Sequence, residues 1–250
     1  MRSMYADSIL GKSLICEFLF NEGAGGYIRD GSPAKLIGTL VTPDWVIEPI
    51  GYNLAPTLDF VLANTDYVNL GTDAVWDDIN TTQEVTFEVL MYCDAALGTV
   101  QTVFSSMVDG TAGVTAFPQL LVDTNGYLLF RPCVDDAGTG KEVSTSTDDY
   151  SGIWAHVVCS YSSGQAEIQV VSELYGDSII SYTETITGTT TLSTLGDDNF
   201  YLGVRQNFDA GPAFENYFDG HIALFRAWSR RLSQSERKRL YYRIASKVGL

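Results

Sequence analysis

The chain has 250 residues, of which 45% are hydrophobic, and it carries a formal net charge of −16 at pH 7. This length allows one large all-β domain or two small ones, and the hydrophobic content suffices for a buried core. No apolar run reaches the roughly 18 residues that a membrane-spanning helix needs, and no secretory signal is evident at the start, so membrane insertion is not expected.

Short strand-like segments recur along the chain. Apolar and polar residues alternate within each segment, and Gly, Asp and Asn bound it. The pattern predicts strands at residues 14–20, 58–60, 66–70, 84–92, 100–106, 119–122, 127–131, 154–161, 166–172, 178–186, 199–204 and 218–228. Asn125-Gly126 and Ser162-Ser163-Gly164 predict hairpin turns, because these residues tolerate the positive φ that tight hairpins need. No linker or internal repeat divides the chain. We therefore expect a single domain over residues 1–250, an all-β, two-sheet antiparallel jelly-roll sandwich.

A helix is expected after the last strand. Ser233 and Glu236 have the spacing of a capping box, in which each residue bonds the backbone N–H of the other. Leu240, Ile244 and Val248 then recur every four residues and form one apolar stripe. The sequence therefore predicts a short C-terminal α-helix at about 233–246.

Charge is unevenly distributed. Residues 226–250 carry eight Lys or Arg and one acid, a net of +7, which leaves −23 on the preceding part. The helix residues Arg237, Lys238, Arg239 and Arg243 are candidates for contact with an assembly partner. The alternative is a solvated helix face balanced by the chain's own acids. The acidic body opposes binding to nucleic acid.

The four cysteines are expected to be buried, reduced thiols. Cys16, Cys93 and Cys159 lie in or beside apolar strand-like runs, and Cys133 completes the set. No Cys-x-x-Cys pair or Cys/His cluster has the spacing of a zinc site. A chain of this size needs no disulfide framework, so folding in a reducing cytosol fits best.

Several segments together resemble a known family. They are Phe18 to Gly23 with Asp30-Gly31-Ser32, Trp45 with Leu58-Asp59-Phe60, Asp66 to Gly71, Trp154-Ala155-His156-Val157, Tyr201-Leu202-Gly203, and Phe218-Asp219-Gly220 followed by Arg230, Leu232, Ser233 and Glu236. Their order and spacing over nearly the whole chain resemble the laminin G-like, concanavalin A-like jelly rolls, a group that includes pentraxin-like lectins. The resemblance implies the fold, but it does not specify the function.

The resemblance implies one structural calcium ion as an option, because jelly rolls of this group often hold one. Asp30 in the first turn and Asp219 on the last strand are the candidate ligands, with Asn21 or Glu22 nearby. A second, pentraxin-like option uses Asn64 and Asp66. The alternative, which is favoured, is that Asp30 and Asp219 cap turns through their side chains.

Catalysis is not expected. Glu84 and Glu88 approach the paired carboxylates of glycosidases of this fold, but Thr86 stands where the central Asp should be. Residues four apart in a strand lie roughly 13 Å from each other, beyond the roughly 5 to 9.5 Å that glycoside hydrolysis requires. The favoured interpretation is a solvent-facing Glu pair. His156 and His221 are expected to be packed and hydrogen-bonded, and no nucleophile elbow is present.

A binding site is expected on the long connection from Arg205 to Tyr217. It carries Phe208, Asp209, Phe214, Glu215 and Tyr217, and such loops on a rigid sandwich are common sites of recognition. All four tryptophans fall at scaffold positions of the pattern, so these aromatic residues are the candidates for contact with a glycan or a protein. Local packing is the alternative.

The leading hypothesis is a non-enzymatic binding and structural module on a virion, made in the host cytoplasm and acting as a capsid decoration or tail accessory protein. Its partners would be other structural proteins of the capsid or tail, surface polysaccharide, or both. A lectin-like carbohydrate-binding module, extracellular or on a cell surface, is the first alternative, and a polysaccharide hydrolase or lyase is the second. Self-association into a homo-oligomer is left open.

Overall fold

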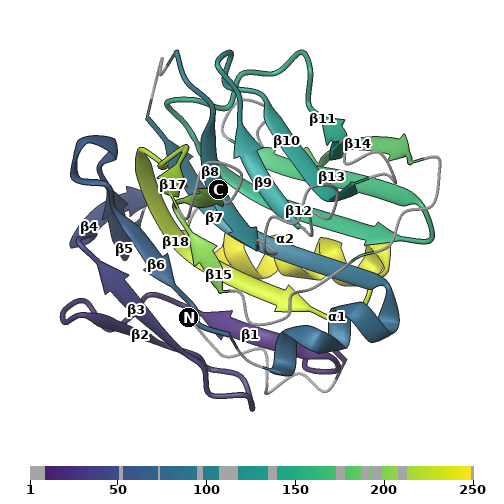
Figure 1. Cartoon of the computed structure of the whole chain (residues 1–250), viewed down its shortest axis with the longest axis horizontal. Helices are drawn as coiled ribbons and strands as arrows, with labels where there is room; N and C mark the ends of the chain where they lie inside the picture. Colours follow the sequence, from purple (N-terminus) through teal and green to yellow (C-terminus); the bar gives the residue numbers. More distant parts are fainter. Residues whose placement is uncertain are drawn as a thin grey trace.

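The structure is a computed structural model and consists mostly of β-strands (Figure 1). It describes residues 9–50, 53–72, 74–94, 98–106, 118–134, 140–172, 178–186, 192, 199–207 and 213–248. In these residues no helix is long and apolar enough to cross a membrane.

One sheet, which we name sheet A, is built around the last strand of the chain. Its order is β14 (Ile180–Thr185), β13 (Gln165–Ser172), β12 (Trp154–Ser162), β7 (Glu84–Cys93), β18 (Gly220–Trp228), β5 (Asn53–Phe60) and β4 (Asp44–Ile50). The first strand, β1 (Leu14–Phe18), pairs with the second half of β18, while β5 pairs with its first half. Strands from both ends of the chain therefore meet on β18.

The facing sheet, sheet B, also has eight strands. Its order is β11 (Gly140–Ser144), β10 (Leu128–Val134), β9 (Gln119–Val122), β8 (Gln101–Ser106), β15 (Phe200–Leu202), β6 (Tyr67–Asn69), β3 (Ile37–Val41) and β2 (Tyr27–Arg29). A two-stranded hairpin, β16 (Arg205–Asn207) and β17 (Ala213–Glu215), follows β15. All ladders between these strands are antiparallel, so the predicted two-sheet jelly roll is confirmed.

The core lies between the two sheets and is rich in aromatic rings. Phe87 of β7 contacts Phe104 of β8 with ring centroids 4.7 Å apart, and Phe225 of β18 lies 5.6 Å from Phe104. The ring of Phe200 stacks on Trp76 at 4.3 Å. Alternate residues of each strand supply these side chains, as the period of two predicts.

Both predicted hairpin turns are present. Ser162 pairs with Gln165, and the two residues between them, Ser163 and Gly164, have φ values of 50° and 79°. Two positive φ values match the twist of the flanking strands. Gly126, with φ 79°, lies in the turn between β9 and β10, where Asp123 accepts a hydrogen bond from Tyr127 N at 2.9 Å.

The sequence did not predict every element. It missed β2, β3, β4, β11, β16 and β17, the short helix α1 (Asp77–Thr82), and the 3₁₀ turns η2 (Leu62–Asn64) and η3 (Ala74–Trp76). Most of these strands are three to five residues long, so they hold too few alternations to be recognised. β5 begins at Asn53, five residues before the predicted start at residue 58.

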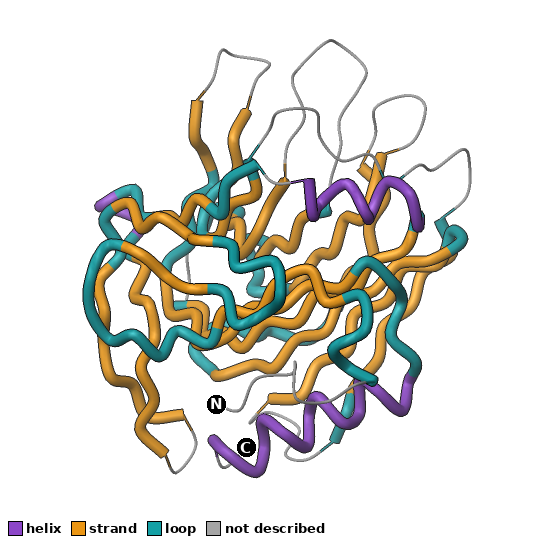
Figure 2. Tube along the Cα trace, turned by 90° about the horizontal axis from the view of Figure 1, so that it is seen from below, coloured by secondary structure: helices purple, strands orange, loops and turns teal. Residues whose placement is uncertain are grey.

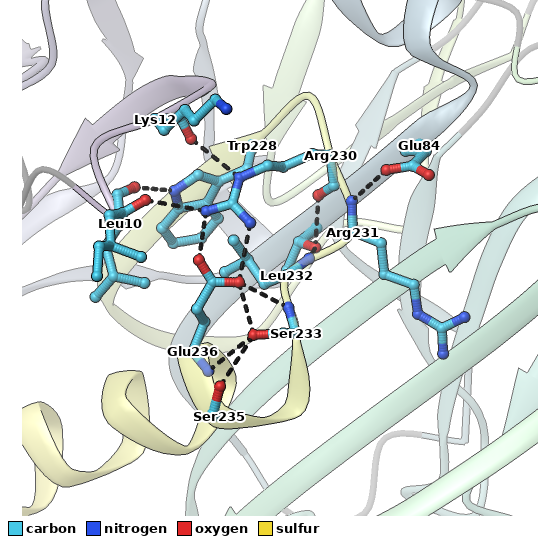
Figure 3. A network of polar contacts seen from close by, with 12 residues as sticks. Leu10, Lys12, Glu84, Trp228, Arg230, Arg231, Leu232, Ser233, Ser235 and Glu236 are labelled. Carbon is cyan, nitrogen blue, oxygen red and sulfur yellow. Dashed lines mark hydrogen bonds and ion pairs between the residues drawn. The ribbon is translucent and has the colours of Figure 1, made fainter.

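The C-terminal helix α2 (Gln234–Val248) begins as predicted, at a capping box. Ser233 N donates to Glu236 Oε2 at 2.8 Å, and Glu236 N donates to Ser233 Oγ at 3.4 Å. Glu236 also receives two hydrogen bonds from the Arg230 guanidinium, at 2.7 and 3.0 Å (Figure 3). Arg230 and the indole of Trp228 in turn donate to main-chain carbonyls of Ile9, Leu10 and Lys12. This junction therefore fixes the helix start and the N-terminal segment together.

Helix α2 lies along the outer face of sheet A (Figure 2). Its apolar stripe contributes Leu240, which packs with Trp228 and Val158, and Ile244, which packs with Leu90 and Ile50. Sheet A is thus covered on both faces, by sheet B on one side and by α2 on the other.

Charged side chains are buried beneath α2, on four neighbouring strands. Arg226 Nε donates to Glu17 Oε1 at 3.0 Å, and its Nη1 donates to Glu88 Oε2 at 2.7 Å. His156 Nε2 lies 2.8 Å from Glu88 Oε1, and the ring of Tyr241 from α2 lies over His156. We name Glu17, Arg226, Glu88 and His156 the buried charge chain; each side chain is at most 2% exposed.

The expectation of a solvent-facing Glu84 and Glu88 pair is wrong. Glu88 points to the outer face of sheet A, but α2 covers that face, so this carboxylate is buried and held by Arg226 and His156. Burial alone would raise the pKa of Glu88. Arg226 and His156 lower it by more than burial raises it, so the pKa of Glu88 lies below its usual value. Glu84 accepts hydrogen bonds from Ser162 Oγ and Arg231 N.

The predicted buried thiols are confirmed where the structure describes them. Cys16, Cys93 and Cys159 are free and buried. Burial raises the pKa of all three, that of Cys93 to about 12, so each stays a protonated and unreactive thiol. The side chain of Cys133 lies outside the described residues.

Replacing Glu236 by Gln tests the helix start. Hydrogen bonds from Arg230 lower the pKa of Glu236 to about 2. Burial acts in the opposite direction, and hydrogen bonds with Ser233 lower the pKa as well. A lowered pKa means that the charged form stabilises the fold above the usual pKa, and that this contribution is lost as the pH falls toward 2. At pH 7 we expect E236Q to lose about 1 kcal/mol of unfolding free energy, shrinking to near zero at pH 2, in denaturant titrations. A difference that is independent of pH would contradict this.

Replacing Arg226 by Met tests the buried charge chain. Two carboxylates would then stay buried without their cation, so we expect the free energy of unfolding to fall by about 3–5 kcal/mol in urea titrations. The matched control is Lys238→Met, which removes an exposed cation from α2 and should change stability by less than about 0.5 kcal/mol. Equal urea midpoints for the two variants would contradict the proposed role of the chain.

Candidate functional site

The outer face of sheet B carries a continuous row of polar side chains. Strand pairing places them side by side across six strands in the order Thr39, Asn69, Tyr201, Ser105, Gln119 and Arg131. We name this set the polar row. The row combines hydroxyl, amide and guanidinium groups, all of which donate hydrogen bonds.

The hairpin of β16 and β17 lies against this row. Phe214 of β17 stacks on Tyr67 with ring centroids 4.8 Å apart, and its edge meets Tyr201 at 5.4 Å. Tyr67 and Tyr201 are themselves in edge contact at 6.0 Å. We name Tyr67, Tyr201 and Phe214 the aromatic cluster. Tyr67 and Phe214 are half-buried, so the cluster presents part of its ring surface to solvent.

Hydrogen bonds fix the hairpin in place. Tyr201 Oη donates to Gln206 Oε1 at 3.1 Å and accepts from Asn199 Nδ2 at 3.0 Å. Ser105 Oγ donates to the carbonyl of Val204, and Thr102 N donates to the carbonyl of Asn216. The aromatic cluster is therefore positioned by the sheet rather than by a free loop.

Charge at the hairpin is balanced. Arg205 Nε lies 3.5 Å from Glu215 Oε1, and both side chains are partly exposed. Tyr217 lies just beyond β17, where burial and the neighbouring Tyr67 raise the pKa of its hydroxyl while a hydrogen bond with Thr65 opposes the shift. The hairpin thus adds a cation, an anion and a phenol beside the rings.

Two polar atoms of the outer face of sheet B are buried without a partner. Gln119 is only 5% exposed, and its Oε1 has no hydrogen bond. The Oγ1 of the buried Thr102 has none either. Buried polar atoms in folded proteins are nearly always paired, often with ordered water, so each of these two oxygens can still accept a hydrogen bond.

The structure brings together part of the predicted loop site. Phe214 and Glu215 lie in β17 and Tyr217 follows it, but Phe208 and Asp209 lie outside the described residues. Sequence analysis missed Tyr67, Tyr201 and the polar row. Strand pairing between distant segments puts β6 beside β15, and the separate hairpin of β16 and β17 then packs Phe214 against Tyr67 and Tyr201.

Asp30 and Asp219 are not brought together. Asp30 accepts hydrogen bonds from Glu17 N, Leu36 N and both N and Oγ of Ser32, so it caps its own turn. It bridges to Phe18, which pairs with Phe225 of β18, six residues from Asp219 and therefore about 20 Å along the strand. The two carboxylates cannot share an ion at that separation.

Asp66 is the better candidate for a cation. Val61 N donates to Asp66 Oδ2 at 2.9 Å, and the next amide, Leu62 N, donates to Asp219 Oδ1 at 3.1 Å. Asp66 is 1% exposed and its Oδ1 has no hydrogen bond, whereas Asn64 is exposed. No group of three or more His, Cys, Asp or Glu in the described part of the chain is arranged to hold a metal. Calcium binding stays a prediction.

The candidate assembly residues do not form one exposed surface. Arg237 is 6% exposed, and its Nη1 donates to Ser160 Oγ and to Glu167 Oε2, each at 2.7 Å. It anchors α2 to the chain's own sheet, so its expected assembly role is wrong. Lys238 and Arg239 are exposed, and Arg243 is half-buried.

His156 is packed and hydrogen-bonded as expected, whereas His221 is partly exposed and its Nδ1 has no hydrogen bond. His156 belongs to the buried charge chain. His221 Nδ1 lies 3.3 Å from Asp59 Oδ1. Burial raises the pKa of Asp59, and the neighbouring acids Asp94 and Asp66 raise it too, while His221 lowers it. In the described part of the chain, the polar partners of the two histidines are the carboxylates Glu88 and Asp59, and no serine or cysteine is hydrogen-bonded to either ring.

Comparison with solved structures supports the fold. The binding domain of botulinum neurotoxin serotype G has a TM-score of 0.65 and 13% identity over 93% of this chain and 51% of its own. The botulinum neurotoxin DC binding domain in complex with SialylT, and the same domain in complex with rat synaptotagmin II, both have TM-scores of 0.63, with 10% and 9% identity, over 94% of this chain. The chain spans about half the length of these domains, 52% in both cases.

No curated protein matches the sequence. A family model does match, over residues 62–236, which is more than half of the chain and includes β6 to β18 and the capping box of α2. The chain belongs to the concanavalin A-like lectin/glucanase superfamily.

Proposed function

We propose that the protein is a non-enzymatic binding module whose ligand lies on the outer face of sheet B. The observation that carries this proposal is the polar row beside the aromatic cluster. The middle of the outer face of sheet A is covered by α2. On the outer face of sheet B the middle of the polar row is buried, at Tyr201, Ser105 and Gln119, whereas Thr39, Asn69 and Arg131 at its two ends are exposed or partly exposed. Function on this fold is determined by such a local site and not by the fold itself.

Saccharide is the ligand class that these side chains fit best. Sugars present an apolar ring face and many hydroxyl groups, and the site offers partly exposed rings next to hydroxyl and amide groups. Asn69, at the accessible end of the row, is oriented by a 2.7 Å hydrogen bond from Gly71 N to its Oδ1. Thr39, Asn69, Tyr67 and Phe214 would form the contact surface.

The structural neighbours support a binding role in a limited way. The botulinum neurotoxin DC binding domain is in complex with SialylT in one structure and with rat synaptotagmin II in another, so a domain of which this chain matches about half takes two different kinds of ligand. Their low identity transfers the fold and no residue. A protein partner is therefore the alternative occupant of the same face.

Hydrolysis is disfavoured by the state of the carboxylates. Glu88 is fully buried under α2 and bonded to Arg226 and His156, so it cannot reach a substrate. Glu84 is bonded to Ser162 and to the main chain of Arg231. A glycosidase needs two accessible carboxyl groups facing one bond.

The finer proposal is that this binding serves a virion surface component made in the host cytoplasm. Three buried, unpaired thiols support folding in a reducing compartment. Sedimentation of the native source tests the proposal: the chain should travel with large particles, and recovery as free protein in every fraction would count against it.

Substitution at the rings tests the ligand site. On a glycan array, wild-type protein should bind a subset of saccharides, and Phe214→Ala and Tyr67→Ala should each weaken binding about tenfold, because each removes one stacking ring. Tyr242→Ala is the matched control, since this exposed ring lies on α2 on the other side of the molecule. Binding that survives both ring substitutions, or that Y242A weakens equally, would contradict the site.

Calcium is tested by thermal unfolding. If Asp66 and Asp219 hold a structural ion, calcium should raise the melting temperature of the chelator-treated wild type by several degrees, since a ligand bound only by the folded state stabilises it. Asp66→Asn should abolish the response, while Asp30→Asn should destabilise the fold and keep it. An unchanged melting temperature in wild-type protein would remove calcium from the proposal.

A further inference from the structure

A small polar pocket lies on the outer face of sheet A, at the β13–β14 edge and beyond the part that helix α2 covers. Six residues line it, namely Gln165, Ala166, Thr183, Glu184, Thr185 and Arg231. Its volume is about 160 Å³, many times the roughly 10–15 Å³ that one water molecule needs by the same measure. The pocket therefore has room for a chemical group of several non-hydrogen atoms.

Strand register turns three of these side chains to the outer face. Thr183 pairs with Glu167, whose carboxylate accepts a hydrogen bond from Arg237 of α2 and so lies on that face. Thr185 and its partner Gln165 lie two residues away along the same strands and point the same way. All three pocket side chains are exposed, so a ligand can reach them.

The other two strand residues border the pocket with their main chain. Ala166 packs in the core, and Glu184 is its partner across the ladder. Both side chains therefore point to the face opposite the pocket, because alternate residues of a strand point to opposite faces. The carboxylate of Glu184 is thus directed away from the pocket.

Arg231 forms the wall of the pocket on the side of α2. It lies in the segment between β18 and the capping box, and Figure 3 shows its guanidinium extending away from that box. Its Nη1 donates to Gln165 Oε1 at 3.3 Å, and its Nη2 donates to Glu167 Oε2 at 2.9 Å. The side chain is 25% exposed. The guanidinium is therefore held in place while part of it faces solvent.

The pocket is built on fixed main chain. Ile186 N donates to the carbonyl of Gly164 at 2.6 Å, which ties the end of β14 to the turn between β12 and β13. Arg231 N donates to Glu84 Oε2 at 3.0 Å, which fixes the segment that carries the guanidinium. A ligand would thus meet groups that are already oriented, which lowers the entropic cost of binding.

The carboxylates beside the pocket already accept hydrogen bonds. Glu167 accepts with both oxygens, from two guanidinium groups and from the amide of Gln169. Both oxygens of Glu84 accept as well, one from Ser162 Oγ and one from the main chain. The acceptors around the pocket are therefore in use.

The groups that line the pocket can still donate. The guanidinium of Arg231 has more N–H groups than the two side-chain hydrogen bonds above use. Gln165 uses its oxygen to accept from Arg231, which leaves its NH₂ group to donate, and the hydroxyl groups of Thr183 and Thr185 can donate too. A group that only accepts, and that carries a negative charge, matches these donors best.

One carboxylate does not fully neutralise the two guanidinium groups that share it. Burial lowers the pKa of Arg237, Glu167 raises it, and Arg231 lowers it again, so that the pKa lies below its usual value. An anion beside Arg231 would offset the repulsion between the two cations. The net charge of −16 repels anions at long range, so binding depends on the short contacts inside the pocket.

We propose that this pocket binds a small oxyanion, namely a carboxylate, sulfate or phosphate group carried by a ligand. Arg231 would form a charge-assisted hydrogen bond with the anion, and the side chains of β13 and β14 would donate from the sheet. The proposal does not rest on the saccharide site, because the two sites lie on different sheets.

Nuclear magnetic resonance of the isotope-labelled full chain tests the pocket. Sulfate, phosphate and glucuronate are titrated separately at constant ionic strength, with glucose as the neutral control. At least one anion should shift the amide signals of residues 183–185 and the Nε–H signal of Arg231 to saturation, with a dissociation constant of about 1 mM. Saturation by glucuronate alone would identify a carboxylate, and saturation by sulfate or phosphate alone would identify a tetrahedral anion. No saturable shift with any anion, or an equal constant for glucose, would overturn the proposal.

Substitutions separate the pocket from anion binding elsewhere. Arg231→Gln should weaken binding at least about tenfold, because it removes the charged donor, and Thr185→Val should weaken it about fivefold, because it removes one hydroxyl group. Lys238→Gln is the matched control, since this exposed cation on α2 lies outside the pocket, and it should leave the constant unchanged.

Urea titrations show whether each variant is folded. T185V changes only an exposed side chain, so it carries the test if R231Q is destabilised. Equal constants for T185V, K238Q and the wild type would overturn the proposal. Failure of saccharide binding on the glycan array would leave these titrations unchanged, so the two proposals fail separately.

Discussion

The closure of sheet A by α2 is the constraint on which the rest of the structure depends. The neighbouring strands β7 and β18 carry Glu88 and Arg226 on their outer side, which would face solvent in an open sandwich. Here the helix covers that side, and the two residues complete a chain of opposite charges with Glu17 and His156. Burying such charges is favourable only when every member has a partner, so the network specifies how the helix lies rather than adding much stability.

This closure also determines where ligands can bind. The helix start is bonded to Arg230, which in turn holds the main chain of Ile9 and Lys12, so both ends of the chain join the cover of sheet A. The outer face of sheet B remains, with the hairpin of β16 and β17 over part of it. Regular strands fix the polar row there by backbone hydrogen bonds, which gives the site the rigidity that recognition requires.

Local signals predicted the elements well, and distant pairings explain the failures. Ser233 and Glu236 lie three residues apart, and Ser163-Gly164 forms a two-residue turn, so each structure is determined by its own neighbours. β2, β3 and β16 are short and exist because other strands pair with them. Glu88 was expected in solvent since no local pattern shows that α2, about 150 residues later, folds over it.

The candidate site was predicted only in part for the same reason. Phe214 and Tyr217 were found because they lie on a long connection. Tyr67 and Tyr201 could not be found, because they look like ordinary strand residues until β6 and β15 pair. Asp30 and Asp219 were grouped by resemblance, yet each uses its carboxylate to satisfy nearby amides. A motif identifies candidate ligands, whereas the register decides which of them meet.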